Sequence, residues 1–85
     1  MKITGIQKPL AARVGNALVS IGVQVDTIGL FQGDMGLTLG MVIQGKAGFE
    51  AAHAHLSLSG WDIQVGMVTQ GVYKINAAPG DPQIH

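Results

Sequence analysis

The sequence of 85 residues contains no cysteine. This absence excludes disulfide bonds, thiolate metal ligands and cysteine nucleophiles, and it is consistent with the cytoplasmic location that we expect. Long apolar runs are missing too. None reaches the ~18 residues of a membrane span, and the N-terminal segment lacks the ~7–15-residue apolar core of a signal peptide. We therefore expect no membrane partner.

Charge is equally scarce. Charged residues make up 12% of the chain, and five basic residues balance five acidic ones. A chain this neutral lacks the Lys and Arg needed to neutralise several phosphates, so we expect no nucleic-acid partner. Hydrophobic residues reach 47% in a chain too short to bury all of them, and copies without net charge repel one another little. We therefore predict a homo-oligomer, a dimer or larger.

Hydrophobic periodicity predicts two helices and five strands. Leu10, Val14, Leu18 and Ile21 form the apolar face of a helix over residues 10–21, which Gly22 ends. A second helix covers residues 49–56. Alternating or short apolar segments predict strands at 3–7, 23–31, 37–43 and 61–68, and a tight turn at residues 70–71 leads into an appended strand at 72–76. Residues 1–77 are predicted to form one domain, with residues 78–85 as an extended C-terminal arm.

The order of these elements predicts an α+β, ferredoxin-like fold. In that βαββαβ arrangement an antiparallel sheet carries both helices on one face. The opposite face is then uncharged along two strands, and glycines within strands mark places where another backbone or a ligand can come close. We predict a subunit interface there, with a bulge or a ligand platform as alternatives. Its residues are Thr38, Gly40, Val42, Gly66 and Val68.

The segment from Gly40 to Ala47 stops one residue short of the phosphate-binding pattern G-x-x-x-x-G-K-[ST]. Ala47 has no hydroxyl group to bind magnesium, so we do not expect nucleotide hydrolysis. Free backbone amides and an ammonium group at a helix N-terminus can still hold an anion, although an ordinary strand-to-helix turn explains the same pattern. The candidate anion site consists of Gly45, Lys46, Ala47 and Gly48.

His53 and His55 are the only candidate metal pair. Residues two apart on a helix point ~200° away from each other, so we expect no metal site and leave a metal carrier as an alternative. His53 is predicted to be partly buried and His55 solvated.

The five carboxylates show no paired spacing, so we predict no catalytic residue and no cofactor, and a small enzyme is a lesser alternative. These carboxylates are Asp26, Asp34, Glu50, Asp62 and Asp81.

Residues 3–68 resemble an ACT domain, the small regulatory module of amino-acid metabolism. The likeness is carried by Lys8-Pro9, by the segment Ala11 to Leu18, by Ile21 to Val25 with Ile28, and by the segments Leu37 to Ile43 and Phe49 to Leu56. The resemblance implies pairing of chains into a larger sheet and an effector near the first strand-to-helix loop. The implied ligand-binding residues are Gln7, Lys8, Pro9 and Leu10.

A second resemblance is to the shell proteins of bacterial microcompartments, and it is carried by the segment Val42 to Ala52. It implies a structural or assembly role. Our expectation from the sequence is a non-catalytic, small-molecule-sensing or regulatory protein whose partners are its own copies, with a small metabolite or a larger enzyme subunit as further partners. The alternative is an assembly protein, either shell-like or an accessory subunit of a larger enzyme.

Overall fold

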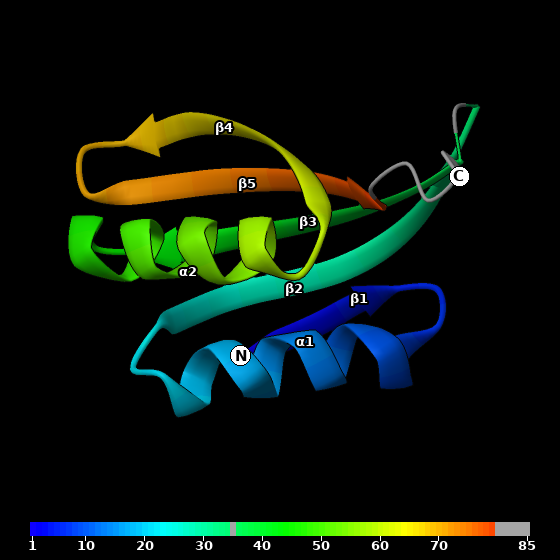
Figure 1. Ribbon diagram of the computed structural model, residues 1–85, viewed down its shortest axis with the longest axis horizontal. Helices are drawn as coiled ribbons and strands as arrows, with labels where there is room; N and C mark the ends of the chain where they lie inside the picture. The colour runs from blue at the N-terminus through cyan, green and yellow to red at the C-terminus, as the bar shows by residue number, and fades with distance from the viewer. Residues whose placement is uncertain (35, 80–85) are drawn as a thin grey trace.

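The computed structural model describes residues 1–34 and 36–79, which form five strands and two helices in the predicted order (Figure 1). The elements are β1 (Lys2–Gly5), α1 (Lys8–Ser20), β2 (Gln24–Gly33), β3 (Gly36–Gln44), α2 (Lys46–Leu58), β4 (Trp61–Thr69) and β5 (Val72–Pro79). The predicted arm is wrong at its start, because Ala78 and Pro79 belong to β5. The remainder of that arm, residues 80–85, lies outside the described residues.

The five strands form one sheet in the order β1-β2-β3-β5-β4. Strand β1 runs parallel to β2, and the other neighbours are antiparallel, so the sheet is mixed. The α+β class is confirmed, whereas the ferredoxin-like arrangement with a fully antiparallel sheet is not. The difference has two sources: α1 joins two adjacent parallel strands, and the strand predicted as an appendage, β5, lies inside the sheet between β3 and β4.

Helix α1 has clear signals at both ends. Pro9 lies in its first turn, where a missing backbone N–H group is tolerated. At the other end Gly22 adopts a φ of 91°, its N–H donates to the Val19 carbonyl at 3.0 Å, and the Val23 N–H donates to the Leu18 carbonyl at 3.1 Å. These two bonds are those of a Schellman cap, so the predicted end of the helix at Gly22 is confirmed.

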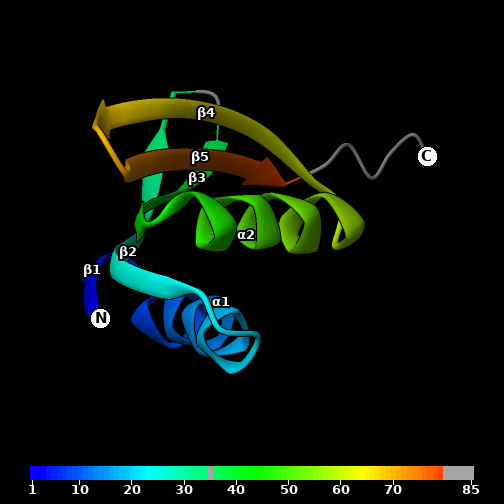
Figure 2. The ribbon, with the colours of Figure 1, turned by 90° about the vertical axis from the view of Figure 1, so that its left-hand side faces the viewer.

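Both helices pack on one face of the sheet (Figure 2). Opposed residues of β2 and β3, such as Ile28 and Met41, share this face, and α1 reaches it through Gly15, where a Cβ atom would lie 3.3 Å from Ile28 Cγ2. Helix α2 approaches at Gly48, where a Cβ atom would lie 3.6 Å from Ile43 Cγ2. Each large side chain buried here stabilises the fold by ~1.5–3 kcal/mol. The largest are Leu18, Ile28, Leu30, Leu39, Met41, Ile43, Leu56 and Ile75.

Candidate functional site

On the face of the sheet that the helices leave open, one row of residues crosses all five strands. Thr4 of β1 is opposite Gly29, which is opposite Gly40 of β3. Gly40 is in turn opposite Asn76 of β5, and Asn76 is opposite Gln64 of β4. Two neighbouring glycines therefore lie in the centre of the row, with polar side chains on both sides of them.

The space above these glycines is taken by the ring of Phe31. A Cβ atom on Gly29 would lie 2.9 Å from Phe31 Cζ, which is too close for a real contact. A Cβ atom on Gly40 would lie 3.8 Å from Phe31 Cε2 and 3.4 Å from Asn76 Oδ1. The sequence predicts a close approach at Gly40, and within a single chain the approaching groups are the Phe31 ring and the Asn76 side chain.

A hollow of about 300 Å³ lies beside the Phe31 ring. One of its lining residues is Lys74, which is exposed. Its other polar groups are two threonine hydroxyls and the amide of Asn76. A cavity that joins a few polar groups to apolar surface is the usual form of a small-molecule site. The lining residues are Thr4, Thr27, Phe31, Gly40, Met41, Val42, Lys74 and Asn76.

Sequence reasoning missed the most polar part of this hollow. Lys74 and Asn76 come from β5, which was predicted as an appended strand with no assigned place beside β3. Their alternation along the strand, with Ile75 buried between them, was the available signal. Only the strand order brings them next to Gly40 and Val42.

Of the five residues predicted as a subunit interface, Thr38, Gly40, Val42 and Gly66 lie on the open face and Val68 lies at the irregularity of β4, and the five do not form one patch. Thr38, Gly40 and Val42 belong to β3, whereas Gly66 and Val68 belong to β4. Strand β5 separates the two groups, and Lys74 is opposite both Val42 and Gly66. An ammonium group thus interrupts the uncharged surface that the sequence suggested, and the interface role of these residues stays a prediction.

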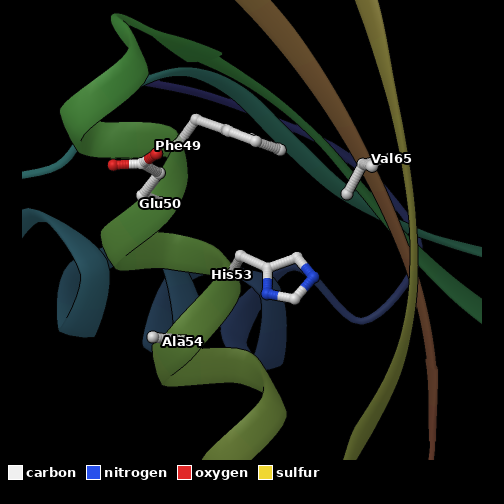
Figure 3. A pocket seen from close by; sticks show the side chains of 5 residues that line it. All are labelled: Phe49, Glu50, His53, Ala54 and Val65. Atoms are coloured by element: carbon white, nitrogen blue, oxygen red, sulfur yellow. The ribbon is translucent and has the colours of Figure 1, made fainter.

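A second hollow, of about 410 Å³, lies on the helix side of the sheet between α2 and β4. Figure 3 shows the side chains of Phe49 and His53 extending from α2 toward Val65 on β4. Phe49 stacks on Tyr73 of β5 with ring centroids 4.5 Å apart, and His53 meets the Phe49 ring edge-on at 6.3 Å. Glu50 and Ala54 complete the lining. We call this hollow, lined by Phe49, Glu50, His53, Ala54 and Val65, the α2–β4 groove.

The two histidines diverge, as the helix geometry predicts, but their burial is the reverse of the prediction. His53 is exposed and lines the α2–β4 groove, whereas His55 is half-buried. The reason is that α2 packs through Ala52 and Leu56, next to which His55 lies, while the helix and β4 stay apart at His53.

Among residues 1–34 and 36–79, no three His, Asp or Glu side chains are grouped to hold a metal ion. Asp81 lies outside those ranges.

In the loop implied as an effector site, Gln7 to Leu10, the Gln7 carbonyl and the Leu10 N–H take part in the first turn of α1. Gln7 adopts a φ of 47°, and its carbonyl accepts the N–H groups of Leu10 at 2.9 Å and Ala11 at 3.3 Å. Gln7, Lys8 and Pro9 are exposed, and Leu10 packs against the core. This loop lines neither of the two hollows described above, and its role as a ligand site stays a prediction.

The candidate anion site, Gly45 to Gly48, forms the turn between β3 and α2. Gly45 adopts a φ of 87°, and its N–H donates to the Gly71 carbonyl at 2.7 Å, so this turn is fastened to the turn between β4 and β5. The Gly45 carbonyl accepts the Phe49 N–H at 3.0 Å. Lys46 and Ala47 are exposed. The geometry is that of an ordinary strand-to-helix turn, and anion binding by these residues stays a prediction.

Comparison with models of protein families, with curated proteins and with solved structures finds no match to this chain. Neither α1 nor α2, the helices of the described segments, combines the length and the apolar composition needed to cross a membrane. Since these comparisons find no match, the function of the candidate site must be inferred from its own chemistry.

Proposed function

We propose that this chain is a non-catalytic, small-molecule-sensing protein, and that it binds a small anionic metabolite on the open face of its sheet. The observation that carries this proposal is the hollow beside Phe31, in which a lysine ammonium lies among uncharged polar groups and next to an aromatic ring. A ligand with a carboxylate or phosphate at one end and an apolar part at the other matches this arrangement.

Each side chain has a distinct part in this recognition. Lys74 supplies a charge-assisted hydrogen bond to the anionic end, which is stronger than a neutral one. Asn76 both donates and accepts, and the hydroxyls of Thr4 and Thr27 do the same. The Phe31 ring, 47% exposed, offers its uncovered face to an apolar group. Gly29 and Gly40 bring the ring and the floor of the hollow together, since neither carries a side chain.

The sensing role that we propose rests on ligand binding by Lys74 and by the amide and hydroxyl groups of the hollow. A ligand held by these groups stabilises the folded chain by mass action. The resemblance to ACT domains implies regulation as well, although it implies a ligand at residues 7–10, a different place. The proposal rests on the hollow and is independent of that family and of a ferredoxin-like strand order.

The test is a thermal-shift screen of small carboxylates and phosphates, followed by titration of the best ligand into variants. Lys74→Gln is expected to weaken binding at least tenfold, which corresponds to ~1.4 kcal/mol. Lys46→Gln is the matched control, because it removes the same charge from the turn before α2 and leaves the hollow intact. The proposal fails if no anion raises the melting temperature, or if Lys46→Gln abolishes binding and Lys74→Gln does not.

A role as an assembly subunit is the second candidate, because β4 leaves Val65, Met67 and Val68 exposed at an edge of the sheet. Assembly predicts particles that grow with protein concentration in light scattering and do not respond to metabolites. A closed dimer instead predicts that particle size stops increasing once two copies have associated.

A further inference from the structure

We propose that two copies of this chain pair through their β4 strands, antiparallel to each other, and that this pairing converts the α2–β4 groove of each copy into one shared cleft. The pairing is independent of the metabolite site proposed above, because that site lies on the other face of the sheet. Either proposal can fail while the other stands.

The first observation is the unpaired edge of β4. Within residues 1–34 and 36–79, its nine residues pair only with β5, so the backbone N–H and C=O groups on its other side have no strand partner in that part of the chain. Proteins usually protect such an edge with lysine, proline, short length or bulges. Strand β4 contains neither lysine nor proline, and its one irregularity lies near its end, between Met67 and Thr69.

The second observation is the exposed apolar side chains of β4. Val65 and Met67 on the helix side are 51% and 64% exposed, and Val68, at the irregularity of the strand, is 59% exposed. The backbone edge and the apolar side chains thus coincide on the same strand. Only another strand supplies both hydrogen-bonding groups in register and side chains to cover these residues.

The third observation is that β4 is complementary to itself. An antiparallel register centred on Val65 uses the whole strand and places Val65 opposite the partner's Val65. On the helix side it pairs Ile63 with the partner's Met67, so apolar residues meet apolar residues. Asp62, the only charged residue of β4, is opposite the partner's Val68, which lies at the irregularity of that strand. No like charges face each other, and a two-fold pair of this kind closes on itself.

Gly66 supports the same pairing. Among the residues that the structure describes, a Cβ atom at this position would meet nothing within 4 Å, so their packing gives no reason for a glycine in the middle of β4. Glycine in a strand weakens it and often marks the close approach of another backbone or ligand. In the register centred on Val65, Gly66 is opposite the partner's Gln64 and leaves room for that longer side chain.

The pairing also completes a site. A two-fold axis perpendicular to the sheet puts the helices of both copies on the same face, so each α2 faces the other across the paired strands. The α2–β4 groove lies between α2, which contributes Phe49 and His53, and Val65 of the edge strand β4 (Figure 3). The partner's α2 supplies the opposite wall, and the two β4 strands, ~4.8 Å apart, form the floor.

Sedimentation velocity over a range of protein concentrations tests the pairing. The wild-type chain is expected to reach a dimer and no larger species. Val65→Lys places two like charges opposite each other on the axis and is expected to stay monomeric at every concentration. Val19→Lys is the matched control, because Val19 on α1 is 49% exposed and lies away from β4, and this variant is expected to dimerise like the wild type.

Single-cysteine variants give a second readout, since the chain has no cysteine of its own. Val65→Cys brings its two sulfur atoms together on the axis, so mild oxidation is expected to give a disulfide-linked dimer much faster than in Val19→Cys. The proposal is overturned if the wild type stays monomeric at the highest concentration, if folded Val65→Lys still dimerises, or if both cysteine variants oxidise at the same rate. Circular dichroism establishes that each variant is folded.

Discussion

At one edge of the sheet, β1 has four residues, begins at Lys2 and ends at Gly5, which adopts a φ of 79°. At the other edge, β4 has nine residues and exposes the apolar side chains of Val65, Met67 and Val68. The first edge has the features that prevent strands from pairing, namely short length, a lysine and a backbone turned out of the β conformation. The second has almost none of them, which indicates that association between copies, where it occurs, uses β4.

Four of the strands contain glycines, so replacing glycine by alanine can measure how tightly each strand is packed. One glycine is compared from each strand from β1 to β4, namely Gly5, Gly29, Gly40 and Gly66. The space around them increases in that order: a Cβ atom would collide with backbone at Gly5, with side chains at Gly29, would touch Asn76 at Gly40, and would meet nothing at Gly66. Replacement by alanine should therefore cost progressively less stability across the sheet.

The largest loss of stability is expected for Gly5→Ala. An alanine there would adopt an unfavourable positive φ, and its Cβ atom would collide with the Leu30 carbonyl oxygen of the neighbouring strand. Strain and overpacking together should lower the free energy of unfolding by about 2–4 kcal/mol, measured by urea denaturation.

Gly71→Ala is the control for that prediction. Gly71 has a nearly identical φ of 78°, but nothing lies within 4 Å of a Cβ atom at this position. Its loss should be only ~1–2 kcal/mol, because it includes the backbone strain without the collision. Equal losses in the two variants would mean that the close contact between β1 and β2 contributes nothing.

A smaller loss, about 1–2 kcal/mol, is expected for Gly29→Ala. The new methyl group would collide with Thr4 Oγ1 and with the Phe31 ring, and both are side chains that can move aside. Phe31→Ala should remove part of the cost, so a double-mutant cycle should show coupling between the two positions. Gly40→Ala is the comparison with a looser fit and should lose less than Gly29→Ala. Additive effects at Gly29 and Phe31 would contradict the contact.

The elements of this fold follow from local patterns, and the order of its strands does not. The spacing of Leu10, Val14 and Leu18 predicts α1, and Gly22 predicts its end, because both signals lie within a few residues of sequence. The place of β5 depends on contacts with β3, such as Met41 with Ile75, that join residues far apart in the chain. Many pairings of these apolar strands satisfy the same alternation, so periodicity alone cannot choose between them.

The same limit explains what was missed at the candidate site. Gly40 could be singled out because a glycine in a strand is unusual in itself. Phe31 and Lys74 look like ordinary strand residues and become notable only when β2, β3 and β5 lie side by side. For His53 and His55 the helix period gave the divergence correctly, but their burial depends on where α2 separates from β4, which is a property of the assembled sheet.

The smallest effect, and one of opposite sign, is expected for Gly66→Ala. The position has no steric obstacle, and alanine lowers the conformational entropy of the unfolded chain, so the free energy of unfolding should rise by ~0.5 kcal/mol or stay unchanged. The measurement belongs at protein concentrations low enough to keep the chain monomeric, so that pairing through β4 does not contribute. A loss larger than that of Gly29→Ala would reverse the comparison, because it would mean that β4 is the constrained edge. In the expected order, the free energy of unfolding falls most for Gly5→Ala and least for Gly66→Ala. That order would mean that packing within a single chain constrains β1 and leaves β4 unconstrained.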